Sequence, residues 1–410
     1  MREPPRRFGK SMAANMVCAY YDRTVDGGAE FSGMECASAP GFDDSYNRYD
    51  VVRLNMQEFL SASHEVEGTL RLLQKGGVLR DLAREYHDLD LMTDAGLPFA
   101  TADIYGQIGR KFVIVIDEWD CVMREKAYDH EAQRAYLDLL RLWLKDRPYV
   151  ALCYMTGILP FKKYGTHSAL NMFSEFSMLA SDEMAPYMGF TEEEVESLCR
   201  EWGRSLTECR AWYDGYRLYG THGTEVEAYS PRSVVRSMET GNFQSYWTQT
   251  ETFDALRRYI DMDMDGLHER VVRLVAGEAV EIDPRTYSND MTTLNNADDV
   301  LTLLVHLGYL TFDVQARAAF VPNREVMGEF ASSVSAGSGW GEVARSISDS
   351  EALLDALVSG DATAVAALAQ IRERGYDRGL DGLAAGGDVV LCGIAYDPKA
   401  KTHSCVIERA

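Results

Sequence analysis

Two patterns of apolar positions alternate in the first half of the chain. Short apolar runs bounded by charged or polar residues, at 49–56, 111–120 and 149–157, are typical of buried strands. Between the second and third runs, residues 131–146 repeat apolar positions at helical spacing, and Pro148 ends that pattern. Strands that alternate with helices favour a parallel sheet with helices on its faces, so we expect an α/β fold.

From residue 191 onward the pattern becomes mainly helical. Thr191 stands three residues before Glu194, the spacing of a capping box. Residues 298–313 (DDVLTLLVHLGYLTFD) predict a helix, a tight glycine turn and a strand. The small, polar residues 331–341 are typical of a linker, and after it an Ala/Leu-rich helical stretch at 351–376 precedes two short strand candidates.

Composition narrows the class of protein. A chain of 410 residues predicts two to three domains of about 150 residues each. No apolar run approaches the roughly 18 residues that span a membrane, and no signal-peptide pattern follows the Arg-rich start, so we expect a cytoplasmic protein. The net charge of -23 disfavours broad nucleic-acid binding. Eight scattered cysteines predict reduced, packed thiols and no structural zinc site.

A phosphate-binding tripeptide stands near the start. Gly9-Lys10-Ser11 precedes a predicted helix at 12–21, and in this order backbone N–H groups, a lysine and a hydroxyl hold a nucleoside triphosphate and its Mg²⁺. The full consensus, GxxxxGKS, has a glycine five residues before the second one, where this chain has Pro4. A surface lysine between small residues is the alternative interpretation.

Carboxylates follow the apolar run at 113–116. Phosphoryl transfer needs an acidic ligand for the metal and a base for water, and Asp117 and Glu118 supply this pair at the end of a strand, where ligands of open α/β folds bind. The alternative is a strand that simply runs into a solvated turn. Thr156 ends the next strand, and it is either a polar sensor of the γ-phosphate or an ordinary strand-end threonine.

Several segments, taken in order, resemble one family: PRRFGKS, VIVIDEWD, MTGILPFKKYGTHSALNMFSEFSML, MGFTEEEV, WYDGYRL, SPRSVV, LLVHLGYLTF and VPNREV. They resemble the bacterial AAA-ATPase-like family, which joins a P-loop NTPase module to a C-terminal PD-(D/E)xK nuclease-type domain. The family's loop reads RPRRFGKS and also lacks the first glycine of the consensus, so Pro4 does not count against the resemblance. The resemblance implies ATP and Mg²⁺ as cofactors. It assigns phosphate and Mg²⁺ contacts to Lys10 and Ser11, and it implies that Asp117 is the metal ligand, Glu118 the base and Thr156 the sensor. Gly9, Arg6 and Arg7 complete the expected cofactor-binding set.

The resemblance also implies two departures from the family. Family members carry a strand ahead of the phosphate loop, and we expect that strand to be missing here. The carboxylate-bearing strands of the nuclease-type domain are expected to be deleted as well. The expected domains are therefore a P-loop domain at 1–190, a helical and winged-helix region at 191–330, a linker at 331–350, and a remnant of a restriction-endonuclease-like α/β domain at 351–410.

The middle region offers further candidates. LLVHLGYLTF resembles the recognition helix and first wing strand of a winged-helix module, a form that often binds DNA. The helix carries two aspartates and no Lys or Arg, which favours internal packing. Packing is also preferred to base stacking for the aromatic residues of 212–247. Arg217 and Arg232 are either arginine fingers or ordinary surface arginines.

The leading hypothesis is an ATP-binding protein with Mg²⁺-dependent ATP hydrolysis that moves its helical and winged-helix region. The rival is a non-catalytic remnant or protein-binding scaffold with an incomplete phosphate loop. A nuclease ranks last. We expect a nucleotide as ligand, leave open an unidentified protein partner, and expect neither nucleic acid nor a membrane as partner.

Overall fold

The computed structural model describes residues 2–3, 8–25, 27–126, 128–160, 172–247, 264, 266–287, 294–335, 390–397 and 402–409. The chain divides into two compact units. The first comprises Met1–Gln244 and Ile282–Ala319, and the second comprises Ser245–Glu281 and Phe320–Ala410.

A three-stranded parallel sheet lies at the centre of the first unit. Its strands are β2 (Asp50–Asn55), β3 (Phe112–Asp117) and β4 (Val150–Met155), in the order β2-β3-β4. These strands confirm the three predicted from the apolar runs and the parallel α/β sheet. In the register, Asn55 lies beside Asp117 and Ile116 lies beside Met155, so the carboxyl ends of all three strands share one edge.

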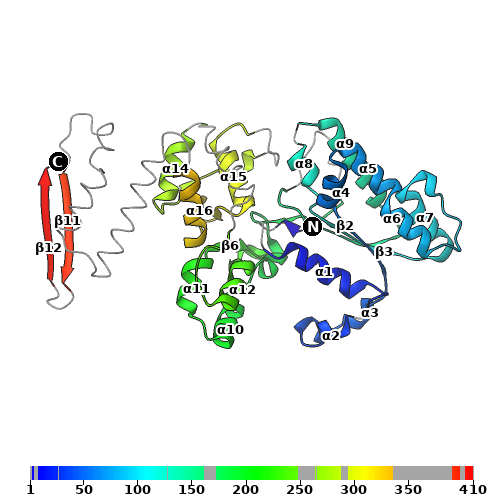
Figure 1. The fold of residues 1–410 in the computed structure, drawn as a ribbon, viewed down its shortest axis with the longest axis horizontal. Coiled ribbons are helices and arrows are strands. Elements are labelled where there is room, and N and C mark those ends of the chain that lie inside the picture. The colour runs from blue at the N-terminus through cyan, green and yellow to red at the C-terminus, as the bar shows by residue number, and fades with distance from the viewer. Residues whose placement is uncertain are drawn as a thin grey trace. The chain divides into compact units, whose positions relative to one another are not determined.

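Alternate residues of β3 bury the two faces of this sheet against different helices. Val113 and Val115 pack with Ala14 of α1 (Lys10–Tyr21) on one face. Ile114 and Ile116 belong to the larger core on the other face. That face is covered, as Figure 1 shows, by α4 (Met56–Ser63), α5 (Val66–Lys75), α6 (Gly77–Glu85), α7 (Leu97–Ile108), α8 (Cys121–Glu125) and α9 (His130–Leu144). The 3-10 helix η2 (Thr93–Ala95) packs on α7.

A short strand precedes the glycine-lysine-serine tripeptide. Strand β1 (Arg2–Glu3) pairs in parallel with β5 (Phe176–Ser177). This pair is a two-stranded sheet separate from β2-β3-β4, so the expectation that the family's strand ahead of the phosphate loop is missing stays a prediction. Between α1 and β2 the chain forms α2 (Gly28–Phe31), η1 (Glu35–Ser38) and α3 (Phe42–Ser45), which gather around Tyr20.

The rest of the first unit is mainly helical, as predicted. Thr191 and Glu194 form the expected capping box at the start of α10. Gly308, with φ 85°, ends α15 and leads to β9, which confirms the predicted helix, glycine turn and strand. The elements are η3 (Asp182–Tyr187), α10 (Glu192–Trp202), α11 (Leu206–Tyr213), β6 (Tyr216–Tyr219), η4 (Thr221–Gly223), β7 (Glu225–Ala228), α12 (Pro231–Thr240), η5 (Pro284–Thr286), α15 (Ala297–Leu307), β9 (Thr311–Asp313) and β10 (Ala318–Phe320).

Helix α15 is buried along almost its whole length, so it packs internally, as its lack of basic residues suggested. Asp299, near its start, is buried and accepts hydrogen bonds from the Thr286 hydroxyl and the Asn295 N–H, both at 2.8 Å. Its acidic residues are therefore part of the packing of the helix start. Whether α15, β9 and β10 form a winged-helix module stays a prediction.

The described elements of the second unit are α14 (Leu267–Val275), β8 (Val280–Glu281), α16 (Arg324–Ser335) and a hairpin of β11 (Val390–Asp397) with β12 (Thr402–Arg409). The hairpin confirms the two strands predicted near the end of the chain. The linker expected from residue 331 is corrected over 331–335, where α16 continues because Val326 and Phe330 anchor the helix in a core. The expected helix at 351–376 lies outside the described residues.

The six cysteines whose side chains are described are free thiols, namely Cys18, Cys36, Cys121, Cys153, Cys199 and Cys209, and all but Cys36 are partly or wholly buried. Burial raises the pKa of Cys121 to about 12 and that of Cys153 to about 12, so these thiols stay protonated. Cys36 is exposed and corrects the expectation that all are packed, because it lies in η1 at the surface. Among the described residues, none of the helices combines the length and apolar character needed to cross a membrane.

Candidate functional site

Helix α1 runs antiparallel to the sheet and brings its first residue to the carboxyl edge of the strands. Its last turn is tied to the start of β2, where the Arg23 N–H donates to Tyr49 O at 3.0 Å and Arg23 Nε to Asp50 at 2.5 Å. Twelve helical residues span about 18 Å at roughly 1.5 Å per residue. Strand β3 has six residues and spans about 20 Å at roughly 3.3 Å per residue. Lys10 therefore lies level with Asp117.

The start of α1 has the geometry of an anion site. Gly9 is its N-cap, and with φ 78° and ψ 18° its backbone is left-handed, a conformation that glycine adopts without strain. No side chain of the described residues caps the helix by a hydrogen bond, and a helix N-terminus with its positive dipole end is a place where anions bind. Lys10 is buried, with 7 % exposed, whereas Ser11 beside it is exposed.

Phe8 fixes the residue before this turn. Its buried ring meets Tyr216 edge-on, with centroids 4.9 Å apart. A Cβ at Gly189 would lie 3.3 Å from Phe8 Cε1 and 2.9 Å from Tyr229 O, so a side chain there would press on this ring. Tyr216 in turn donates from its hydroxyl to Gly308 O at 3.0 Å. The start of α1 is thus attached to β6 and the end of α15.

At the same edge, the structure brings Asp117 and Thr156 into direct contact. Asp117 is buried, with 1 % exposed, and its Oδ1 accepts from the Thr156 hydroxyl and from the Glu118 N–H, the latter at 3.1 Å. Thr156 is held because its N–H donates to Ile116 O at 2.9 Å, which extends the β3–β4 ladder by one bond. The two residues at the ends of neighbouring strands thus form one polar cluster.

Glu118 has a left-handed backbone, with φ 53°, which turns its side chain out of the strand direction. Its Oε2 accepts from Arg124 Nη2 at 2.5 Å. Arg124 also donates from Nε to Asp120 Oδ2 at 3.1 Å, and Asp120 is fully buried. The sequence analysis missed Asp120 and Arg124, although a carboxylate and a guanidinium four residues apart are a pairing signal in a helix.

Trp119 and Gly157 close the turn behind these carboxylates. The Trp119 N–H donates to Thr156 O at 3.0 Å, and the Tyr136 hydroxyl donates to Trp119 O at 2.9 Å. A Cβ at Gly157 would lie 2.5 Å from Trp119 Nε1, so only glycine fits there without a shift. This packing fixes the positions of Asp117, Glu118 and Thr156 relative to one another.

The other candidates fall outside this cluster. Arg6 and Arg7 lie outside the described residues. Arg217 pairs with Asp313 and, at 3.4 Å, with Glu225, so it links β6, β7 and β9. Arg232 is exposed on α12. Tyr213, Tyr216 and Trp247 are buried, which confirms their packing role.

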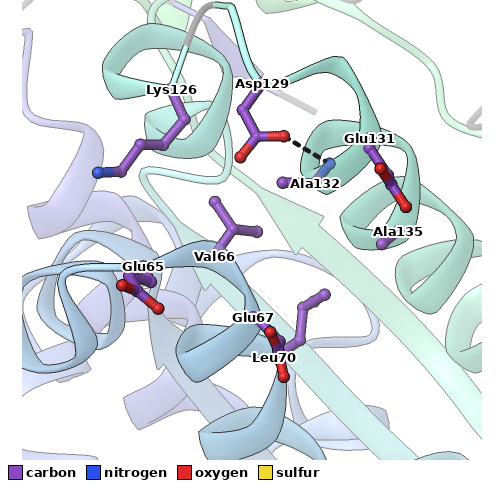
Figure 2. A pocket seen from close by; sticks show the side chains of 9 residues that line it. All are labelled: Glu65, Val66, Glu67, Leu70, Lys126, Asp129, Glu131, Ala132 and Ala135. Carbon is purple, nitrogen blue, oxygen red and sulfur yellow. Dashed lines mark hydrogen bonds between the residues drawn. The ribbon is translucent and has the colours of Figure 1, made fainter.

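A separate cavity of about 680 Å³ lies between the starts of α5 and α9 (Figure 2). Its lining carries Glu65, Glu67, Asp129 and Glu131, and one lysine, Lys126. Lys126 donates to His64 O at 3.0 Å, and Asp129 caps α9 by accepting from Ala132 N–H at 3.0 Å. This acidic lining repels a polyphosphate, so the cavity is not a nucleotide site.

A comparison with protein families covers the part of the chain in which the candidate site lies. Residues 2–166 match the model of a family described as "Predicted AAA-ATPase", and they make up less than half of the 410 residues. No curated protein matches the chain. The matched segment includes Gly9-Lys10-Ser11, Asp117 and Thr156 and does not extend into the predicted winged-helix and nuclease-type regions. Residues 2–166 are therefore similar to a predicted AAA-ATPase, and this is the part that carries the candidate site.

Proposed function

We propose that the first unit binds ATP with Mg²⁺ at the carboxyl edge of β3 and β4 and hydrolyses it. The observation that carries the proposal is the polar cluster of Asp117 and Thr156, level with the buried Lys10 at the uncapped start of α1. A buried lysine at a helix N-terminus and a buried carboxylate at the same edge of the sheet supply the opposite charges that a phosphate and its metal require. The family description of residues 2–166 supports the same activity.

The residues present fit such a ligand. The first N–H groups of α1 would donate to phosphate oxygens, and Lys10 would contact the β- and γ-phosphates. The exposed Ser11 hydroxyl and the Asp117 carboxylate are oxygen ligands of the kind that Mg²⁺ prefers. We propose Arg6 and Arg7 as further phosphate contacts.

In hydrolysis, the nucleotide with its Mg²⁺ supplies a polarised γ-phosphoryl group. Glu118 orients the attacking water and accepts its proton. Thr156 holds Asp117 through their hydrogen bond, which supports the proposal that Thr156, directly after β4, acts as the sensor of the γ-phosphate. The contact of Phe8 with Tyr216 offers a route by which nucleotide binding moves the helical region.

The test is a calorimetric titration of the purified chain with ATP and Mg²⁺. We expect Lys10→Ala to weaken binding about tenfold or more, since a hydrogen bond to a charged group contributes about 1.5–3 kcal/mol. Lys111→Ala is the matched control, because Lys111 is exposed at the opposite end of β3, and it should bind as the parent does.

A second measurement separates the ATPase from the non-catalytic scaffold. A ligand at about 100 times its dissociation constant stabilises the folded state by about 2.7 kcal/mol, so ATP with Mg²⁺ should raise the melting temperature. An unchanged melting temperature with millimolar ATP and Mg²⁺, together with a flat titration, would favour the scaffold. Nuclease activity is not expected of residues 351–410, and Mg²⁺-dependent cleavage of DNA or RNA would contradict that expectation.

A further inference from the structure

The Glu118 carboxylate is held at one of its two oxygens. Arg124 Nη2 donates to Oε2 at 2.5 Å, and none of the described residues donates to Oε1. The side chain keeps a quarter of its surface exposed, so water can reach it. One fixed and one free oxygen is an arrangement in which a carboxylate can orient a water molecule without rotating away from it.

Arg124 is itself firmly anchored. Its side chain is 11 % exposed, and its Nε donates to the fully buried Asp120 at 3.1 Å. Asp120 Oδ2 also accepts from the backbone N–H groups of Ile158 and Leu159, both at 3.0 Å. Burial alone would lower the pKa of Arg124, but the carboxylates of Asp120 and Glu118 outweigh burial and raise that pKa, so the guanidinium stays charged.

The backbone around Glu118 is arranged to support this contact. A left-handed conformation costs free energy at a residue other than glycine and persists where neighbouring bonds enforce it. The Glu118 N–H donates to Asp117 Oδ1, and Glu118 O accepts from the Cys121 N–H, both at 3.1 Å. A strained backbone together with a buried, anchored guanidinium argues that the position of this carboxylate matters to the protein.

We infer that Arg124, anchored by Asp120, is a positioning residue for Glu118: it holds Oε2 and leaves Oε1 to accept the proton of the attacking water. The inference rests on the proposed ATP hydrolysis and adds two residues to it. Arg124 does not act as an arginine finger here, because its guanidinium is bound to Glu118 and Asp120, which directly precede its own helix.

The experiment measures ATP hydrolysis, ATP affinity by calorimetry, and melting temperature for the full chain. The variants are Arg124→Met, Glu118→Gln and the double variant, with Arg71→Met as control, because Arg71 forms an exposed ion pair on α5. We expect Arg124→Met to lower kcat about 10- to 100-fold, the size of effect that misplacement of a reacting group produces, with the Kd for ATP unchanged within about twofold. In the Glu118→Gln background, Arg124→Met should change kcat less than about twofold, because the residue acts through Glu118.

Arg124→Lys covers the case in which Arg124→Met fails to fold. Lysine keeps a charge beside the buried Asp120 but lacks the fork that reaches both carboxylates, so this variant should melt as the parent does and show an intermediate kcat.

Two outcomes would overturn the inference. One is that Arg124→Met lowers kcat by the same factor in the parent and in the Glu118→Gln background. The other is that Arg124→Met leaves kcat unchanged. If the parent binds ATP without hydrolysing it, the inference fails while nucleotide binding stands. If the parent does not bind ATP at all, the proposed function itself fails.

Discussion

Phe8 lies edge-on against Tyr216, with ring centroids 4.9 Å apart and an angle of 87° between the planes. Phe8 directly precedes the left-handed Gly9, and Tyr216 begins β6, so this contact joins the candidate phosphate site to a segment far along the chain. Aromatic edge-to-face pairs contribute about 0.5–1.5 kcal/mol beyond the area that they bury. The start of α1 is therefore held from outside the parallel sheet.

We expect Phe8→Ala to lower the free energy of unfolding of the first unit by about 3–5 kcal/mol, because it removes a buried aromatic side chain. ATP affinity should fall as well, since the turn at Gly9 loses its anchor. Chemical denaturation and calorimetric titration measure the two effects. Phe99→Ala is the control: Phe99 is 43 % exposed on α7, so its removal should cost little. Equal losses in the two variants would contradict the role of Phe8.

Alanine substitutions at two glycines should change the free energy of unfolding in opposite directions. A Cβ at Gly157 would lie 2.5 Å from Trp119 Nε1 and 3.1 Å from Asp120 Cγ, so Gly157→Ala should push the turn that carries Glu118 and lower both stability and ATP hydrolysis. Gly106 is exposed within α7, and nothing lies within 4 Å of its added Cβ. Gly106→Ala should raise the free energy of unfolding by about 0.5–1 kcal/mol. Thermal melts compare the two variants, and stabilisation by Gly157→Ala would show that the turn is looser than the distances indicate.

His306 predicts a pH dependence of stability. It is buried in α15, and burial lowers its pKa from 6.5 to about 4. Between these two pH values the unfolded chain binds a proton at this residue and the folded chain does not, so the free energy of unfolding falls as the pH falls through this window. The loss amounts to about 3 kcal/mol at most, at about 1.36 kcal/mol for each pKa unit.

The check is denaturation at pH 8 and at pH 5 for the parent and for His306→Leu. The difference in unfolding free energy between the two pH values should be smaller in the variant. His87→Gln is the control, because that side chain is 72 % exposed and its replacement should leave the difference unchanged. If His306→Leu did not reduce this difference, the pH dependence of stability would come from other titratable groups.

The parallel sheet and the polar ends of its strands could be predicted because they depend on local pattern. The run at 113–116 is apolar at every position, which is typical of a strand buried on both faces, and the residues after it necessarily emerge at the sheet edge. Asp117 and Thr156 meet because β3 and β4 are neighbours in parallel, so the meeting of two predicted strand ends needed only that pairing.

The contacts that fix the site could not be predicted in the same way. Phe8 contacts Tyr216, which lies far from it along the sequence, and no periodic pattern of apolar residues relates the two positions. The role of Asp120 depends on two backbone N–H groups that follow β4, which a sequence pattern does not reveal. The linker expected at 331–341 failed at its start because small residues are also tolerated in a helix, and buried Phe330 holds α16 in place.

The hydrogen bond from Thr156 to Asp117 gives the last prediction. Thr156→Val keeps the shape of the side chain and removes the hydroxyl, so the buried Asp117 carboxylate loses a donor. Asp117 Oδ1 keeps the hydrogen bond from the Glu118 N–H but loses the second one, and because a hydrogen bond to a charged group contributes about 1.5–3 kcal/mol, the free energy of unfolding should fall by about that amount. Hydrolysis of ATP should fall too, because Asp117 is no longer held in one orientation.

Thr156→Ser is the control, because it keeps the hydroxyl. It should retain most of the stability in chemical denaturation and most of the ATP hydrolysis in steady-state assays. If serine were as damaging as valine, the methyl group of Thr156 would be what matters, and the hydrogen bond would have no special part in holding the carboxylate.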